Sequence, residues 1–253
     1  MTSRRDRVWL FDLDNTLHDA SHAAFGPTNR AMTAYIEQHL GLDHDAASAL
    51  RQHYWSRYGA TLLGLVRHHG VRADHFLEQT HLQPGLEQRV RASPHDRAAL
   101  KRLVGRKFVL TNAPRAYALR VLGALRLKDC FDGVISIEDM TMFGHWRPKP
   151  DARMLRHVLT RLKVRASDCV LIEDVLANQK AAHGLGLTTV WMQRYLDGRY
   201  RGRFGATAGA AIRDAFNAPA KPGAKRREVG VHPCPSPAYV YAKIKSLQKL
   251  LRL

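Results

Sequence analysis

Five short apolar runs recur along the chain, and they constrain its fold more than any other feature. Each is too short for a helix and is rich in β-branched or aromatic residues. Continuous apolar runs of this kind are typical of strands buried on both faces, as in a parallel sheet. The runs are Val8–Phe11, Phe108–Leu110, Val134–Ile135, Val170–Ile172 and Thr188–Met192.

Helical segments lie between these runs. A helix is expected at Pro94–Val104, with Ser93 as its N-cap and Pro94 at the first position. Three further helices are predicted at Pro114–Leu125, Pro150–Leu162 and Leu176–Gly184. Because strands and helices alternate, the sequence predicts an α/β fold with a Rossmann-like, doubly wound parallel sheet.

Residues 21–89 interrupt this alternation. They hold no convincing strand, and apolar residues such as Ala31, Ile36, Leu62 and Leu65 follow a helical spacing. We expect a helical cap inserted after the first strand, either as a side layer or as a lid over the end of that strand. The catalytic core would then consist of residues 1–20 and 90–193.

The last quarter of the chain has a different composition. Residues 194–237 are rich in Arg, Gly and Pro and are expected to form a basic, flexible insertion. Residues 238–253 are expected to close the core, with a strand at Ala238–Tyr241 and an amphipathic helix at Lys243–Leu253.

The net charge of +18 suggests a nucleic-acid partner at first sight. However, 13 of the 40 basic residues but only 3 of the 22 acidic ones lie from Arg194 onward, so over half of the excess is in the last quarter of the chain. A nucleic-acid-binding protein that uses this basic region is the alternative from a different class. Nucleic acid is therefore not the expected partner of this chain.

Several cellular contexts are disfavoured by composition. No apolar run approaches the ~18 residues of a membrane helix, and the apolar stretch near the start is too short for a signal peptide. Three cysteines, Cys130, Cys169 and Cys234, cannot form a disulfide framework. We expect a cytoplasmic protein with no membrane partner; the sequence does not predict an oligomeric state.

The candidate chemistry lies where the predicted strands end. Asp12, Asp14 and Thr16 follow the first strand, Thr111 and Asn112 follow the second, and Glu173 and Asp174 follow the fourth. Lys149 lies between two prolines. Right-handed crossovers bring these ends to one edge of the sheet, where ligands bind in doubly wound folds.

Clustered carboxylates repel one another unless a cation lies among them, and their hard oxygen ligands suit Mg²⁺. The hydroxyl of Thr111, the amide of Asn112 and the ammonium of Lys149 are then natural donors to phosphate oxygens. A carboxylate at a strand end can also act as a nucleophile, and a second one can transfer the proton.

These residues carry a resemblance. VWLFDLDNTL at Val8–Leu17, VLTN at Val109–Asn112, RPKP around Lys149 and LIEDVLAN at Leu171–Asn178 resemble, in order, the four motifs of the haloacid dehalogenase-like hydrolases over residues 7–193. The resemblance implies a Mg²⁺-dependent enzyme that forms a phosphoaspartate.

The resemblance also implies individual roles. Asp12 would be the nucleophile and a metal ligand, and Asp14 the acid/base, with its backbone carbonyl on Mg²⁺. Asp174 would be a metal ligand, while Thr111 and Lys149 would hold the transferring phosphoryl group, with Asn112 beside them. Three residues would support the site: Thr16, Glu173 and Asn178.

Two details refine this expectation. Many relatives have Asp where this chain has Asn178, which is expected to orient Lys149 or a metal-bound water. Dehalogenases of the superfamily lack the acid/base residue, because a halide leaves without a proton. Asp14 therefore favours an oxygen leaving group and a phosphatase, with a phosphomutase as the remaining option.

The substrate is suggested by the cap. Tyr54–Leu65, YWSRYGATLLGL, resembles the cap of the pyrimidine 5′-nucleotidase group, which has a C1-type helical cap. His18, Tyr58 and Gly59 are candidates to meet the base or ribose, although the tyrosines could equally be helix-core aromatics. We therefore expect a pyrimidine nucleoside 5′-monophosphatase of the UMP/CMP type. The alternative is a phosphatase for another small phosphomonoester, phosphoglycolate or a sugar phosphate.

Overall fold

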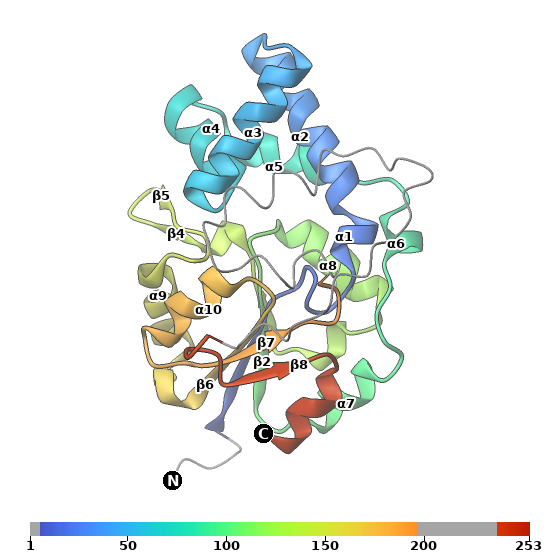
Figure 1. The fold of residues 1–253 in the computed structure, drawn as a ribbon, viewed down its shortest axis with the longest axis vertical. Coiled ribbons are helices and arrows are strands. Elements are labelled where there is room, and N and C mark those ends of the chain that lie inside the picture. Colours follow the sequence, from blue (N-terminus) through green and yellow to red (C-terminus); the bar gives the residue numbers. More distant parts are fainter. Residues whose placement is uncertain (1–5, 197–236) are drawn as a thin grey trace, which may run out of the picture.

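A six-stranded parallel sheet forms the centre of the computed structural model, which describes residues 6–196 and 237–253 (Figure 1). The strand order is β3-β2-β1-β6-β7-β8, and every neighbouring pair runs parallel. This confirms the predicted doubly wound α/β fold. The strands are β1 (Val8–Phe11), β2 (Arg106–Leu110), β3 (Gly133–Ile135), β6 (Cys169–Glu173), β7 (Thr188–Met192) and β8 (Ala242–Ile244).

Helices cover both faces of this sheet because successive residues of each strand point to opposite sides. Trp9 and Phe11 of β1 pack in one apolar cluster, and Val8 and Leu10 pack in another. The first cluster includes side chains of α7 (Asp96–Arg102), α8 (Arg115–Ala124) and the 3-10 helix η6 (Leu247–Arg252). The second includes side chains of α9 (Ala152–Leu162) and α10 (Leu176–His183).

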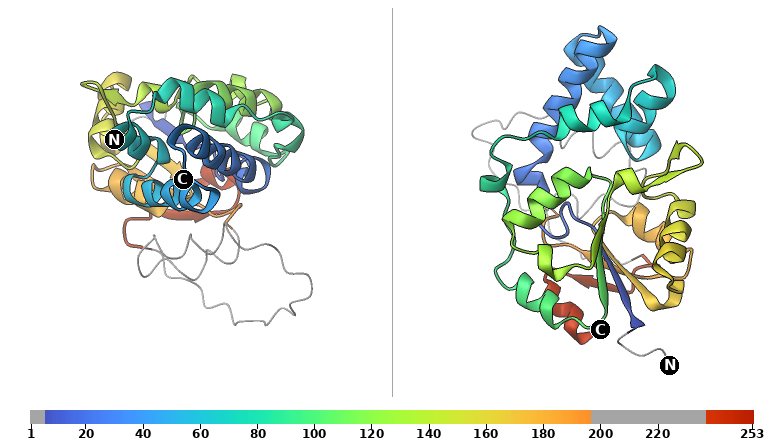
Figure 2. Two further views of the ribbon diagram at one scale, coloured as in Figure 1. Left: turned by 90° about the horizontal axis from the view of Figure 1, so that it is seen from above. Right: turned by 180° about the vertical axis from the view of Figure 1, so that it is seen from behind.

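The helices of residues 20–89 gather at one end of the molecule, beyond the carboxyl ends of the strands (Figures 1 and 2). Four of them share an apolar cluster of their own, to which Ile137 and Trp146 of the core also contribute. These four are α2 (Phe25–Leu40), α3 (His44–Tyr58), α4 (Thr61–His69) and α5 (Ala73–His81), and the shorter α1 (Ala20–Ala23) and α6 (Leu86–Arg89) flank them.

Several predicted boundaries differ by a few residues in the structure, and the contacts explain two of these differences. The helix expected from Pro94 begins at Asp96, because the Asp96 amide closes a turn onto the carbonyl of Ser93 at 3.0 Å. The Ser93 hydroxyl caps that turn instead, accepting from the amide of His95.

The closing strand lies four residues later than expected. Val240 donates to the carbonyl of Pro237 in a turn, and Tyr241 is 70% exposed. Ala242–Ile244 pairs with β7 instead, because Ile244 can bury its side chain against the sheet. The segment after it forms the 3-10 helix η6 rather than an α-helix from Lys243.

Smaller elements complete the core. A hairpin of β4 (Thr141–Met142) and β5 (His145–Trp146) precedes the loop that carries Lys149. Three short 3-10 helices are η2 (Lys128–Cys130), η3 (Ile137–Asp139) and η4 (Ala166–Asp168). Most of the expected basic insertion, 194–237, lies outside the described residues. Among those described, no helix is long and apolar enough to cross a membrane.

Candidate active site

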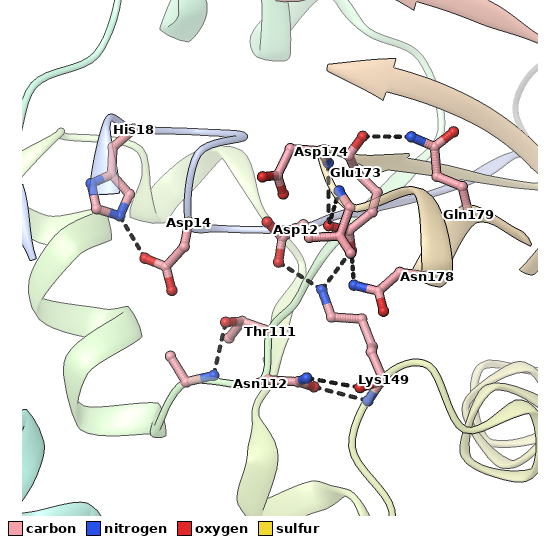
Figure 3. Close-up of polar contacts among 12 residues, drawn as sticks. Asp12, Asp14, His18, Thr111, Asn112, Lys149, Glu173, Asp174, Asn178 and Gln179 are labelled. Atoms are coloured by element: carbon pink, nitrogen blue, oxygen red, sulfur yellow. Dashed lines mark hydrogen bonds and ion pairs between the residues drawn. The ribbon is translucent and has the colours of Figure 1, made fainter. Parts of the chain in front are cut away.

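The polar strand ends converge where the strand order reverses. The chain proceeds from β1 to β2 and β3 on one side and then returns to β6 on the other, so β1 and β6 flank the topological switch point. The amide of Asp12 donates to the carbonyl of Ile172 at 2.9 Å and extends the β1–β6 pairing by one bond. The carboxyl groups that follow these two strands therefore lie side by side (Figure 3).

Lys149 joins the two strand ends. Its ammonium donates to Asp12 Oδ1 at 2.6 Å and to Glu173 Oε2 at 2.8 Å, and its side chain is only 3% exposed. Burial by itself lowers the pKa of Lys149, but the carboxylates of Asp12 and Glu173 raise it above its ordinary value. The lysine therefore remains a cation in the interior.

Asn112 fixes the loop that carries this lysine. Its Oδ1 accepts from the backbone amide of Lys149 at 2.9 Å, and its Nδ2 donates to the carbonyl of the same residue at 3.0 Å. Asn112 was expected to bind phosphate, but in this structure its amide is used to position Lys149. Thr111, by contrast, is buried, and its hydroxyl accepts from the amide of Ala113 at 3.0 Å and donates to no other described residue. Its hydroxyl proton remains available to a ligand.

Glu173 is the most heavily bonded carboxylate of the site. Besides Lys149, it accepts from Asn178 Nδ2 at 3.0 Å and from the backbone amides of Asp174 at 3.2 Å and Val175 at 3.1 Å. Asn178 and Lys149 thus share Glu173 Oε2 as their acceptor, and the expected role of Asn178 in orienting Lys149 or a metal-bound water stays a prediction.

Two residues that the sequence reasoning missed fix the same turn. Gln179 Nε2 donates to the Glu173 carbonyl at 2.8 Å, and Trp191 Nε1 donates to the Asp174 carbonyl at 2.9 Å. Both hold backbone groups through side chains of neighbouring elements. The motif around Glu173 and Asp174 carries no signal for either partner.

The carboxyl groups of Asp12, Glu173 and Asp174 form an acidic cluster, with ligand oxygens within 4.8 Å of one another. Burial, followed by the charge of Glu173, raises the pKa of Asp12 to about 8. Burial and the neighbouring carboxylates of Glu173 and Asp12 also raise the pKa of Asp174 well above its ordinary value. The single positive charge of Lys149 thus does not balance the three carboxyl groups of the cluster when they are ionised. An oxygen-only donor set of this kind fits a hard divalent cation such as Mg²⁺.

Asp14 lies two residues beyond Asp12, in a turn that includes Asn15 and Thr16. Asn15 adopts a positive φ of 58°, a conformation that Asn tolerates, and its side chain accepts from the Ser21 amide at 3.0 Å. Thr16 is completely buried, and its hydroxyl has no hydrogen-bond partner in the part of the chain described.

The three candidate substrate residues are found in different places. His18 is completely buried and contacts Asp14, not an open surface. Tyr58 is half-buried at the end of α3, where its hydroxyl lies 2.7 Å from His68 Nε2. Gly59 approaches the core: a Cβ at this position would lie 3.3 Å from the carbonyl of Lys149 and from the Pro150 ring.

Fold and site together define a hydrolase of the doubly wound α/β class with an acidic centre at its switch point. The chain belongs to the haloacid dehalogenase-like hydrolases, whose family model matches residues 7–186. This confirms the superfamily suggested by the four motifs.

Comparisons with individual proteins are more distant. The chain is 22% identical over 192 residues to phosphate metabolism protein 8 of Saccharomyces cerevisiae, a match that covers 72% of this chain and 60% of that protein. It therefore spans less than two thirds of the length of this curated relative.

Two solved structures resemble the fold over almost the whole chain. One is a HAD phosphatase from Thermococcus onnurineus, with 18% identity, 97% and 96% of the two chains covered and a TM-score of 0.57. The other is a HAD hydrolase from Bacillus subtilis bound to magnesium, with 16% identity, 98% of each chain covered and a TM-score of 0.52. At these identities the likeness concerns the fold.

Proposed function

We propose that this hydrolase cleaves phosphomonoesters with the help of Mg²⁺, through a phosphoaspartate at Asp12. The observation that carries the proposal is the pairing of Lys149 with Asp12 and Glu173 beside the buried acidic cluster. A buried lysine next to a carboxylate nucleophile offers positive charge to the oxygens of a transferring phosphoryl group.

The residues divide the reaction among them. Asp12 attacks phosphorus in line, and the ester oxygen leaves with a proton from Asp14. Lys149 and the Thr111 hydroxyl hold the oxygens of the phosphoryl group while charge accumulates on them. Asp14 then takes a proton from the water that splits the phosphoaspartate, which returns both carboxyl groups to their starting states.

The acidic cluster would hold the cation. Asp12 and Asp174 would contribute carboxylate oxygens, and Asp14 would contribute its backbone carbonyl. When bound, Mg²⁺ supplies charge that favours the ionised form of Asp12 and neutralises the phosphoryl oxygens. Glu173 is already engaged by Lys149 and Asn178, so we assign it to supporting the site.

For the substrate we propose a pyrimidine nucleoside 5′-monophosphate such as UMP or CMP. The support is the likeness of Tyr54–Leu65 to a pyrimidine nucleotidase cap, together with the approach of Gly59 to the loop of Lys149. We propose that residues 21–89 act as the lid that selects this substrate. Phosphoglycolate or a sugar phosphate is the alternative within the same chemistry.

A substrate panel tests both levels of the proposal. The chain would be assayed for phosphate release from nucleotides and sugar phosphates, with Mg²⁺ and with EDTA. We expect turnover only with Mg²⁺, fastest with UMP or CMP, and none in the Asp12→Asn variant. Comparable rates on sugar phosphates would reject the nucleotidase assignment alone. Undiminished turnover in the Asp12→Asn variant would reject the mechanism.

A further inference from the structure

The carboxylate of Asp14 is held by two donors that lie outside its motif. His18 Nε2 lies 2.9 Å from Asp14 Oδ1, and the Tyr117 hydroxyl donates to the same oxygen at 2.8 Å. Within the described part of the chain, no hydrogen bond reaches the second oxygen, Oδ2. Figure 3 shows the His18 ring turned toward this carboxylate. The side chain of Asp14 is 20% exposed, so the unbonded oxygen is the one left for a substrate.

The protonation of His18 follows from its surroundings. Its ring is completely buried, and Nδ1 has no hydrogen-bond partner among the described residues. A proton on Nδ1 would be a buried donor without an acceptor, which is costly. We therefore assign a proton to Nε2, so that the ring donates to Asp14. A backbone β-bridge pairs His18 with Asp14 and keeps the two residues side by side.

Tyr117 provides the second donor from a different element. It lies in α8, the helix that follows Thr111 and Asn112, and it is 3% exposed. An ionised carboxylate can only accept hydrogen bonds, so the hydroxyl of Tyr117 is the donor in this contact. Helix α8 and the turn after β1 therefore fix the same oxygen from two directions.

We propose that His18 and Tyr117 are positioning residues that fix Asp14 so that Oδ2 alone exchanges the proton of the reaction. This inference rests on the proposed phosphatase function. As the ester P–O bond breaks, its electron pair stays on the leaving oxygen, which takes the proton from Oδ2. The two donors on Oδ1 then stabilise the resulting carboxylate. His18 thereby acts on the acid/base, in place of the contact with a base or ribose expected from the sequence.

The dependence of the rate on the leaving group distinguishes a positioning role from a general loss of structure. An alkyl phosphate needs a proton on its leaving oxygen, whereas p-nitrophenyl phosphate releases an anion that is stable without one. The ratio kcat/KM reports the steps up to phosphorylation of Asp12, so it isolates the acid role of Asp14. The experiment compares kcat/KM for β-glycerophosphate and p-nitrophenyl phosphate in the wild-type chain and in variants.

We expect His18→Leu and Tyr117→Phe each to lose at least tenfold more activity on the alkyl ester than on the aryl ester. A well-placed general acid contributes about 10²–10⁴-fold, and misplacement forfeits part of this. His18→Gln, whose amide can donate near the position of Nε2, should restore the wild-type ratio. Tyr35→Phe is the matched control, because Tyr35 is also buried and bonded to a histidine, but within the cap. It should leave the ratio unchanged.

Equal losses on both esters in the His18 and Tyr117 variants would overturn the inference, because a purely structural role lowers both rates alike. If His18→Leu does not fold, Tyr117→Phe and His18→Gln decide by the same ratio. A wild-type chain that hydrolyses neither ester would reject the proposed phosphatase function itself. The two failures are thus distinguishable.

Discussion

Replacing Asp12 by Asn should stabilise the folded chain in the absence of divalent cations. Burial and Glu173 raise the pKa of Asp12 from 3.8 to about 8. At neutral pH the unfolded chain therefore ionises a carboxyl that the folded chain retains in protonated form, and folding bears this cost. Integrated from the two pKa values, the cost is on the order of 4 kcal/mol at pH 7. The Asp12→Asn variant would avoid it, while Lys149 keeps its ion pair with Glu173.

The sign of the effect depends on pH in a defined way. An acid whose pKa is raised on folding destabilises the fold increasingly as pH rises from its unfolded value of 3.8 to about 8. The advantage of the Asn variant should therefore be small near pH 4, about 1–2 kcal/mol at pH 5, and largest near pH 8. Urea unfolding in EDTA at these three pH values measures it directly.

Asp129→Asn provides the matched control. Arg97 and Lys101 lower the pKa of Asp129, an exposed carboxylate, so its loss should decrease stability slightly instead of increasing it. The reasoning would be refuted if the Asp12→Asn variant were less stable than the wild type in EDTA. It would also be refuted if the difference in the free energy of unfolding were the same at every pH. Stabilisation combined with lost turnover would show that the nucleophile is kept at a cost to the fold.

Two further predictions concern stability away from the acidic cluster. Burial lowers the pKa of His81 from 6.5 to about 4, so at pH 5 the unfolded chain binds a proton at this histidine and the folded chain does not. Stability should fall by about 2 kcal/mol from pH 7 to pH 5 on this account, and urea unfolding of His81→Asn should show that loss removed. Asp96 pairs with Arg194 in the interior, with the two side chains 1% and 14% exposed. Asp96→Asn should lower the free energy of unfolding in urea by about 3 kcal/mol. Asp74 pairs with Arg72 on the surface, so Asp74→Asn should lower it little. Similar losses in both variants would contradict the burial argument.

The parallel sheet was predictable because burial on both faces leaves a direct mark on the sequence. Val8–Phe11 is apolar without interruption, and all four residues are buried between two helical layers. The hairpin at Thr141–Met142 and His145–Trp146 left no such mark, since two-residue strands have no periodicity. The closing strand was misplaced because Ala238–Tyr241 is the more β-like segment, yet only Ala242–Ile244 can reach β7 with a buried Ile.

The convergence of Asp12 and Glu173 followed from crossover handedness and from the position of each residue after a strand. Lys149 was assigned to the same site by the resemblance of its motif. Their partners could not be predicted in this way. Tyr117 lies in the first turn of α8, where its spacing indicates only a core residue, and its contact with Asp14 depends on how α8 packs. The pairing of Asn112 with the Lys149 backbone likewise depends on a loop conformation that spacing does not encode.

The position of β1 has a consequence for the motions of the molecule. This strand lies inside the sheet, between β2 and β6, and none of its residues is more than 2% exposed. Its amides should be among the slowest to exchange with solvent deuterium, with protection approaching that of global unfolding. The edge strand β8 should open far more often. Brief local openings at the periphery therefore leave the backbone of Asp12 undisturbed.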